Sequence, residues 1–197
     1  MTDESHSDVP GESPSVDFSN QFLMAMPNMV EGSLAGSVIY ICEHTTKGAL
    51  GLVINRPTDL TLGTLFERIE LDLEIAPVKA TPVFFGGPVQ TDRGFVLHMP
   101  PGDYNSSIKL GGLALTTSRD VLQAVAEGNG PQQMLVTLGY AGWGAGQLES
   151  EMARNAWLNV SADPHIIFDV PPEDRYPAAL KLLGIDPVML AGDAGHA

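Results

Sequence analysis

The sequence predicts a single compact α/β domain, of the α+β kind, with a mixed, largely antiparallel sheet flanked by helices. The chain has 197 residues, of which 44% are hydrophobic, enough for one core without disulfides. Short apolar runs bounded by Gly, Asn or Pro alternate with stripes of helical period. Most connections between the expected strands are too short to contain a crossover helix, which favours antiparallel pairing.

Both ends of the chain differ in composition from the middle. Residues 1–17 contain five acidic residues, no Lys or Arg and few apolar side chains, so we expect a disordered acidic tail. The Gly/Ala-rich stretch 191–197 is expected to fray. No repeat or interdomain linker divides the remaining residues, and we therefore place one α/β domain at 18–190.

The first half of the domain begins with three apolar runs rich in β-branched residues, which predict strands at 22–26, 37–42 and 49–54. Leu65 and Ile69 belong to a stripe at helical spacing that starts after Thr61. Because Thr is a good helix N-cap, this stripe predicts a helix that begins there.

The second half continues with short elements. Strands are expected at 82–85 and 94–98, and the stretch between them suits a wide hairpin or a strand exchange. The pattern Thr117-x-x-Asp120 predicts the capped start of a helix. We further expect strands at 108–115, 134–140 and 165–170, a helix at 147–156, and a last helical stripe that ends at Gly184.

Charge and cysteine content narrow the function classes. The 24 acidic residues against 10 Lys and Arg give a net charge of −14, which argues against direct nucleic-acid or anionic-membrane binding. The single Cys42 excludes an intramolecular disulfide, and its apolar strand favours a buried, inert thiol. No signal-peptide pattern and no apolar run of about 20 residues is present, so we expect a cytosolic (cytoplasmic) protein without a membrane span.

The densest cluster of unusual residues is the segment 139–151, interpreted as a strand that runs through a glycine loop into a helix. Its candidate ligand-binding residues are Gly142, Trp143, Gly144 and Gln147, because backbone N–H groups at such a junction bind anions or carbonyl oxygens. The spacing matches neither a dinucleotide fingerprint nor a P-loop. A tight turn with acidic capping is the competing interpretation.

Glu149 is the most informative acidic residue. At about 100° per residue it falls within the apolar face of the expected helix. A carboxylate there must be paired with a cation or must face a cleft, because burying it alone costs several kcal/mol. Arg56 and Arg93 are the candidate partners, and both alternatives stay open.

Two arginines follow expected strands. Arg56 ends one strand, and Arg93 leaves the loop that contains Gly86 and Gly87, so these four residues are candidate ligand-binding positions. Together the arginines would hold a carboxylate or phosphate in bidentate fashion. Alternatively, they tie loops to neighbouring acidic side chains.

The two histidines at strand ends, His44 and His98, show no spacing typical of metal ligands, so we expect no metal site. An exposed histidine titrates near neutral pH, which makes His98, with Glu149, a candidate for acid–base catalysis. No Gly-x-Ser-x-Gly elbow and no cofactor motif is present, and we expect no cofactor.

Six segments in order resemble the YqgE/AlgH family of bacterial proteins. They are Phe22-Leu23-Met24-Ala25-Met26-Pro27, Val38-Ile39-Tyr40-Ile41-Cys42-Glu43-His44, Gly51-Leu52-Val53-Ile54-Asn55-Arg56-Pro57, Phe85-Gly86-Gly87-Pro88-Val89, Arg93-Gly94-Phe95-Val96-Leu97-His98, and Gly142-Trp143-Gly144-Ala145-Gly146-Gln147-Leu148-Glu149-x-Glu151. The resemblance implies a compact α/β domain in the bacterial cytosol, without an established reaction. Some family members are labelled transcriptional regulators, but no basic stripe or helix-turn-helix supports DNA contact here.

Our first functional hypothesis is a small anionic or polar ligand bound in a cleft formed by Arg56, residues 86–94 and residues 142–151. Arg56 and Arg93 would hold the ligand, Trp143 would stack on it, and Glu149 or His98 would transfer a proton. Whether any reaction is catalysed stays open. The alternative is a regulatory protein that acts through contacts with a protein partner, and direct DNA binding is the weakest hypothesis.

Overall fold

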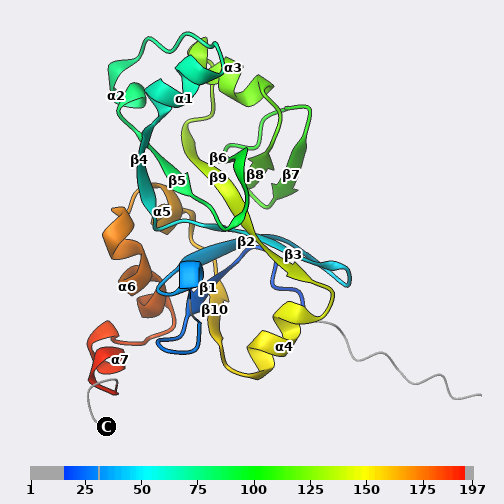
Figure 1. Ribbon diagram of the computed structural model, residues 1–197, viewed down its shortest axis with the longest axis vertical. Coiled ribbons are helices and arrows are strands. Elements are labelled where there is room, and N and C mark those ends of the chain that lie inside the picture. Colours follow the sequence, from blue (N-terminus) through cyan, green and yellow to red (C-terminus); the bar gives the residue numbers. More distant parts are fainter. Residues whose placement is uncertain (1–15, 31, 194–197) are drawn as a thin grey trace, which may run out of the picture.

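The structure is a computed structural model that describes residues 16–30 and 32–193 (Figure 1). It confirms the predicted fold class, because a large, curled, mostly antiparallel sheet is flanked by helices. Most of the tail expected at residues 1–17 and the last four residues of the stretch 191–197 lie outside the described residues. The described part of that stretch continues the last helix.

The sheet of the described residues has ten strands. They are β1 (Gln21–Ala25), β2 (Val38–Thr45), β3 (Gly48–Val53), β4 (Pro57–Thr61), β5 (Pro82–Phe85), β6 (Val89–Met99), β7 (Ser107–Leu110), β8 (Leu113–Thr116), β9 (Gln133–Gly144) and β10 (Trp157–Ser161). The helices are α1 (Leu62–Arg68), α2 (Ala76–Lys79), α3 (Asp120–Ala126), α4 (Gln147–Ala153), α5 (Pro164–Phe168), α6 (Pro172–Leu182) and α7 (Pro187–Asp193), with a 3₁₀ turn at Gly32–Leu34. In the part of the chain that the structure describes, no helix has the length and hydropathy that a membrane crossing requires.

Strand β9 joins the two halves of the molecule. The strand order is β10-β1-β2-β3-β9-β6-β8-β7, and β4 and β5 form a branch. One edge of β9 pairs with β6, whereas the other edge pairs first with β5, in parallel, and then with β3. Figure 1 shows β9 running from the part of the molecule that holds α1 and α3 down to α4.

Both faces of the central strands are buried, which explains their uninterrupted apolar runs. In β1 and β2, Phe22 and Tyr40 belong to the hydrophobic cluster that includes residues of α5 and α6. Leu23 and Ile39 point the other way, into the cluster completed by Leu148 of α4. A third cluster lies beneath α1 and α3.

The connection from β5 to β6 crosses β9 through a contact between glycine backbones. The Gly86 amide donates to the Leu138 carbonyl at 2.9 Å, and the Val53 amide donates to the Gly86 carbonyl at 2.8 Å. A Cβ atom on Gly87 would lie 2.0 Å from the carbonyl carbon of Tyr140, and one on Gly139 would lie 2.3 Å from the Gly87 oxygen. Only glycine fits at these positions. Of the two alternatives predicted for this stretch, a wide hairpin and a strand exchange, the structure has the strand exchange.

Several predicted elements differ from the structure because short apolar runs do not distinguish a strand from a helical turn. The strand expected at 165–170 is helix α5, which the Asp163 side chain caps by accepting from the His165 amide. The strand expected at 108–115 is a hairpin, β7 and β8, that turns at Gly111, where φ is +58°. Strands β4 and β10 were not predicted.

Of the two predicted helix caps, one is confirmed and one is wrong. Thr61 does cap α1, as predicted, since its hydroxyl accepts from the Thr64 amide. Thr117 does not cap α3, which begins after Arg119 without a side-chain cap. The Asp120 carboxylate instead accepts from the Asn105 amide, 15 residues earlier, because the loop before β7 returns to this helix.

We predict that Gly87→Ala destabilises the fold by about 3 kcal/mol or more, because φ is +154° and the added methyl group would overlap the Tyr140 backbone. Gly94→Ala, at the next bend of the same segment, is the control, since no atom lies within 4 Å of its Cβ position. Urea denaturation measures both free energies of unfolding. Equal stability of the two variants would contradict the close crossing.

Candidate functional site

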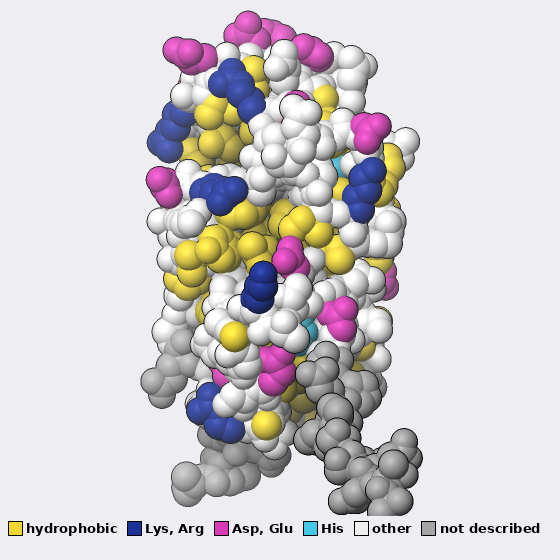
Figure 2. Space-filling view, turned by 90° about the vertical axis from the view of Figure 1, so that its right-hand side faces the viewer, with side chains coloured by type: hydrophobic (Ala, Val, Ile, Leu, Met, Phe, Trp, Pro, Cys, Tyr) yellow, Lys and Arg dark blue, Asp and Glu magenta, His cyan; other side chains and the backbone are white. Residues whose placement is uncertain are grey.

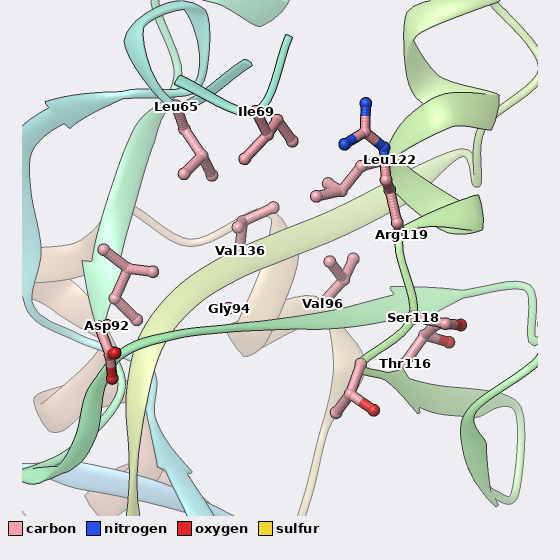
Figure 3. Close-up of a pocket in the computed structure, with 12 residues that line it drawn as sticks. Leu65, Ile69, Asp92, Gly94, Val96, Thr116, Ser118, Arg119, Leu122 and Val136 are labelled. Atoms are coloured by element: carbon pink, nitrogen blue, oxygen red, sulfur yellow. The ribbon is translucent and has the colours of Figure 1, made fainter. Parts of the chain in front are cut away.

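A cleft of about 240 Å³ lies between helices α1 and α3. Val96 of β6 and Val136 of β9 form its floor, and Leu65, Ile69 and Leu122 form its walls (Figure 3). The wall side chains are half-buried, whereas the floor is buried beneath them. The cleft is therefore an apolar slot on the face of the sheet that the two helices only partly cover.

Polar groups stand at the rim of this cleft. Arg119 lies at one side with an exposed guanidinium group, and Asp92 lies at the far end of the floor (Figure 3). The Thr116 hydroxyl is bound to His98 and Ser107. The Ser118 hydroxyl donates to Asp120 at 2.5 Å. Among the described residues, no acceptor binds the Arg119 guanidinium, so a cation faces solvent beside an apolar slot.

The molecular surface carries further apolar side chains. In Figure 2, hydrophobic side chains gather in a band across the face that is turned toward the viewer, with Lys and Arg side chains at its borders. The chain has 10 Lys and Arg residues in all, so cations that border an apolar surface are an unusual feature of this acidic protein.

Arg56 serves a local structural purpose. Its two terminal nitrogens donate to the Ser33 and Ala35 carbonyls and thereby hold the turn before β2. The neighbouring Asn55 binds the same turn, because its side chain donates to Gly36 and accepts from the Val38 amide. The structure does not bring Arg56 into contact with Arg93 or Glu149.

Arg93 is exposed and lies on the Phe95 ring, with its guanidinium carbon 5.4 Å from the ring centre. It also donates to Gln90 at 3.3 Å. Its neighbours Asp92 and Gly94 line the α1–α3 cleft, so this part of the predicted site does border a hollow. In contrast, Gly86 and Gly87 lie packed against the backbone of β9, at the point where the chain crosses that strand.

Glu149 is paired with a histidine, not with an arginine. Its Oε1 lies 2.5 Å from Nε2 of His44, whose side chain is 4% exposed. The Phe18 amide donates to His44 Nδ1 at 3.0 Å, so the ring proton resides on Nε2 and is donated to the carboxylate. The backbone amide of Glu149 itself, together with His44, holds the pKa of that carboxyl below its ordinary value. This arrangement fastens the chain before β1 to the end of β2.

His98 is fully buried, not exposed at a strand end. Nε2 lies 2.7 Å from the Thr116 hydroxyl and Nδ1 lies 2.9 Å from the Pro100 carbonyl, so both ring nitrogens have partners. Burial lowers the pKa of His98, and the Pro100 carbonyl opposes this shift only in part. The argument for acid–base catalysis by His98 therefore loses its premise.

The expected glycine loop at 142–146 is mostly strand. Gly142, Trp143 and Gly144 end β9, and the chain turns only at Ala145 and Gly146. Trp143 is 6% exposed and packs edge-on against Trp157, with ring centres 6.1 Å apart, so it is a core residue and not a stacking platform on the surface. The Gln147 side chain accepts from the Gly144 amide at 3.0 Å.

Sequence reasoning missed one buried cation. Arg175 of α6 is 5% exposed, donates to the Val170 and Ile54 carbonyls, and lies on the Phe84 ring. Burial lowers its pKa to about 10. Helix α6 also carries Glu173, Asp174 and Lys181, so nothing in the sequence marks Arg175 as the buried charge. The described residues contain no cluster of three side chains able to hold a metal ion, and Cys42 is buried, with a pKa raised by that burial.

Comparison with known proteins agrees with the motif resemblance. The family model for AlgH-like proteins (DUF179) matches residues 22–188. A UPF0301 protein of Bordetella petrii is 81% identical over the whole of both chains, and one of Ralstonia nicotianae is 61% identical over 92% of this chain and 96% of its own. The solution structure of AlgH from Pseudomonas aeruginosa, 48% identical, superposes with a TM-score of 0.77 over 96% of this chain and all of that one. A Corynebacterium diphtheriae protein, 20% identical over 86% of this chain and 89% of its own, shares the fold with a TM-score of 0.65.

We predict that the free energy of unfolding falls as the pH drops below about 6.5, because folding lowers the pKa of His98 and the unfolded chain binds the proton more readily. Above that pH, neutral His98 makes its full contribution to the free energy of unfolding. In His98→Asn the dependence between about pH 7 and about pH 5 should be shallower. Denaturant titrations at several pH values measure the free energy of unfolding of both proteins. If it changed equally with pH in wild type and in His98→Asn, His98 would not be the source of the pH dependence.

A second prediction concerns the fastening by His44. His44→Phe keeps an aromatic ring against Phe18 but removes the acceptor at Nδ1. Hydrogen exchange at the Phe18 amide should accelerate about tenfold. Glu43→Gln, an exposed neighbour in β2, should leave that rate unchanged. Unaltered exchange in the His44 variant would show that the hydrogen bond contributes nothing.

Proposed function

This chain belongs to the AlgH-like family, and we propose that it binds a small amphipathic ligand with one anionic group in the cleft between α1 and α3. The observation that supports this proposal is the exposed Arg119 guanidinium beside an apolar slot. Arg56 and Arg175 are engaged by backbone carbonyls. Arg119 is not, and it is therefore available to a ligand.

The size and walls of the cleft define the ligand. A volume of about 240 Å³ is below the usual 300–1,000 Å³ of sites for drug-sized ligands, so the ligand is small. Val96, Val136 and Leu122 offer an apolar body its contacts. Burial of that body supplies most of the affinity, at about 25 cal/mol per Å² of apolar surface.

The rim sets the orientation of the ligand. Arg119 and the neighbouring Thr117 hydroxyl would bind the anionic group by charge-assisted hydrogen bonds. Asp92, at the other end of the floor, repels a second anionic group. The site thus favours a monoanion such as a carboxylate with an aliphatic chain over a dianion.

This proposal moves the ligand away from the cleft that the sequence suggested. Residues 92 and 94 border it, but Arg56, Trp143 and Glu149 do not. Of the side chains that line the cleft, none is a histidine, cysteine or lysine. We therefore propose binding, and no reaction is assigned.

We predict that octanoate binds more tightly than 1-octanol, which has the same chain without the charge, and that Arg119→Ala weakens octanoate binding about tenfold while leaving octanol binding unchanged. Isothermal titration calorimetry measures both. Lys181→Ala, which removes an exposed cation of α6, is the matched control.

Two results would contradict the proposal. One is the absence of saturable binding by either probe. The other is equal affinity of wild type and Arg119→Ala for octanoate, since the carboxylate would then not contact the arginine.

A further inference from the structure

A second hollow, of about 400 Å³, lies near the tip of the β2–β3 hairpin, beside the end of β9. Leu50 of β3 and Tyr140 of β9 line it, and both pack against the hydrophobic cluster that includes residues of α5 and α6. Leu148 of α4 packs into the cluster on the other face of the sheet. The hollow therefore lies on the face opposite α4, and it shares no lining residue with the α1–α3 cleft.

The floor of this hollow is apolar and can be reached from solvent. It consists of Leu50, Val89 and Tyr140, each of which is half-buried. Glycine at position 142, directly opposite Leu50, leaves room for the Tyr140 ring, because a Cβ atom on Gly142 would lie 3.1 Å from Cε2 of Tyr140. The floor thus offers a ligand one aromatic ring and two aliphatic side chains.

The rim carries polar groups that the described part of the chain does not pair with one another. Glu43 and Lys47 are exposed, and neither forms an ion pair with a described residue. The Thr45 hydroxyl accepts from the Lys47 amide at 3.1 Å, which leaves its own proton for donation. The Tyr140 hydroxyl has no partner among the described residues and reaches solvent.

These groups restrict the ligand. An apolar ligand would remove water from the Glu43 carboxylate and the Lys47 ammonium group without replacing the lost hydrogen bonds. A ligand with a net charge would be repelled by one of the two, and an anion also by the net charge of −14 of the chain. Floor and rim together fit a neutral molecule with one apolar face and an edge that both donates and accepts hydrogen bonds.

We propose that this hollow binds a neutral pyranose sugar. Sugar hydroxyl groups donate to Glu43 and accept from Lys47 and Thr45, since a hydroxyl group does both. The C–H face of the sugar packs on Tyr140 and Leu50. The volume of the hollow is within the usual 300–1,000 Å³ of small-molecule sites.

The methyl β-glycosides of glucose, galactose and mannose are the probes, and the Gly142 amide is the reporter in a ¹H–¹⁵N spectrum. We expect at least one glycoside to shift this signal saturably, with a Kd of about 1–10 mM, while the Leu122 amide at the α1–α3 cleft does not shift. Cyclohexanol, an apolar ring with a single hydroxyl group, should bind about tenfold more weakly. Methyl β-D-glucuronide, which carries a carboxylate, should bind no more tightly than the neutral glycoside.

Two pairs of variants test the rim. Lys47→Met removes the donor but keeps a long side chain, and Glu43→Leu removes the acceptor at similar size. Each should weaken glycoside binding about tenfold. Lys181→Met on α6 and Glu67→Leu on α1 are the matched controls and should bind like wild type. Because all these side chains are exposed, the substitutions leave the core intact, and the amide spectrum verifies that each variant is folded.

The proposal is overturned if none of the glycosides produces a saturable shift up to about 50 mM. It is also overturned if cyclohexanol binds as tightly as the glycosides, because the rim would then contribute nothing. Tighter binding of the glucuronide would instead indicate an anion site at Lys47, and full affinity in both rim variants would show that neither charge contacts the sugar.

Discussion

The close passage of the chain over β9 at Gly86, Gly87 and Gly139 is the constraint on which the two halves of the fold depend. Strand β5 pairs with one edge of β9 and β6 pairs with the other, so the short connection between them must cross the strand. Backbone atoms approach there to distances that no side chain permits. The crossing leaves the rest of that edge of β9 free to pair with β3, and a single strand thereby serves both halves of the sheet.

The placement of two hollows follows from this arrangement. Near the start of β9, helices α1 and α3 cover the sheet incompletely and leave an apolar slot between them. Beyond the end of β9, helix α4 packs against the opposite half and leaves a cavity beside the turn before β2. Each hollow combines apolar walls with one arginine, yet the polar groups differ. The slot has Arg119 at its rim, whereas the cavity has Arg154 together with Glu151.

The arginines and histidines show why residue type alone does not identify a site. Arg56 and His44 stand at strand ends, where ligand sites of α/β proteins often occur. The structure uses Arg56 to hold a turn, and uses His44 with Glu149 to hold the segment before β1. Such fastening satisfies backbone groups that water would otherwise have to reach. The same residue types would have served a ligand equally well, and only their neighbours in space decide between the two.

The sequence by itself determined the fold class, the family and the positions of the longer elements, because periodicity, caps and glycine positions are local properties of the chain. It predicted the helix after Thr61, limited the stretch near Gly86 to a wide hairpin or a strand exchange, and identified Glu149 as a carboxylate that is either paired or open to a cleft. Only the tertiary structure decided that the partner is His44, 105 residues away, that His98 is buried, and that Arg119, Glu151 and Trp157 line hollows. Those facts depend on long-range strand pairing, which short apolar runs specify weakly because many registers bury them equally well.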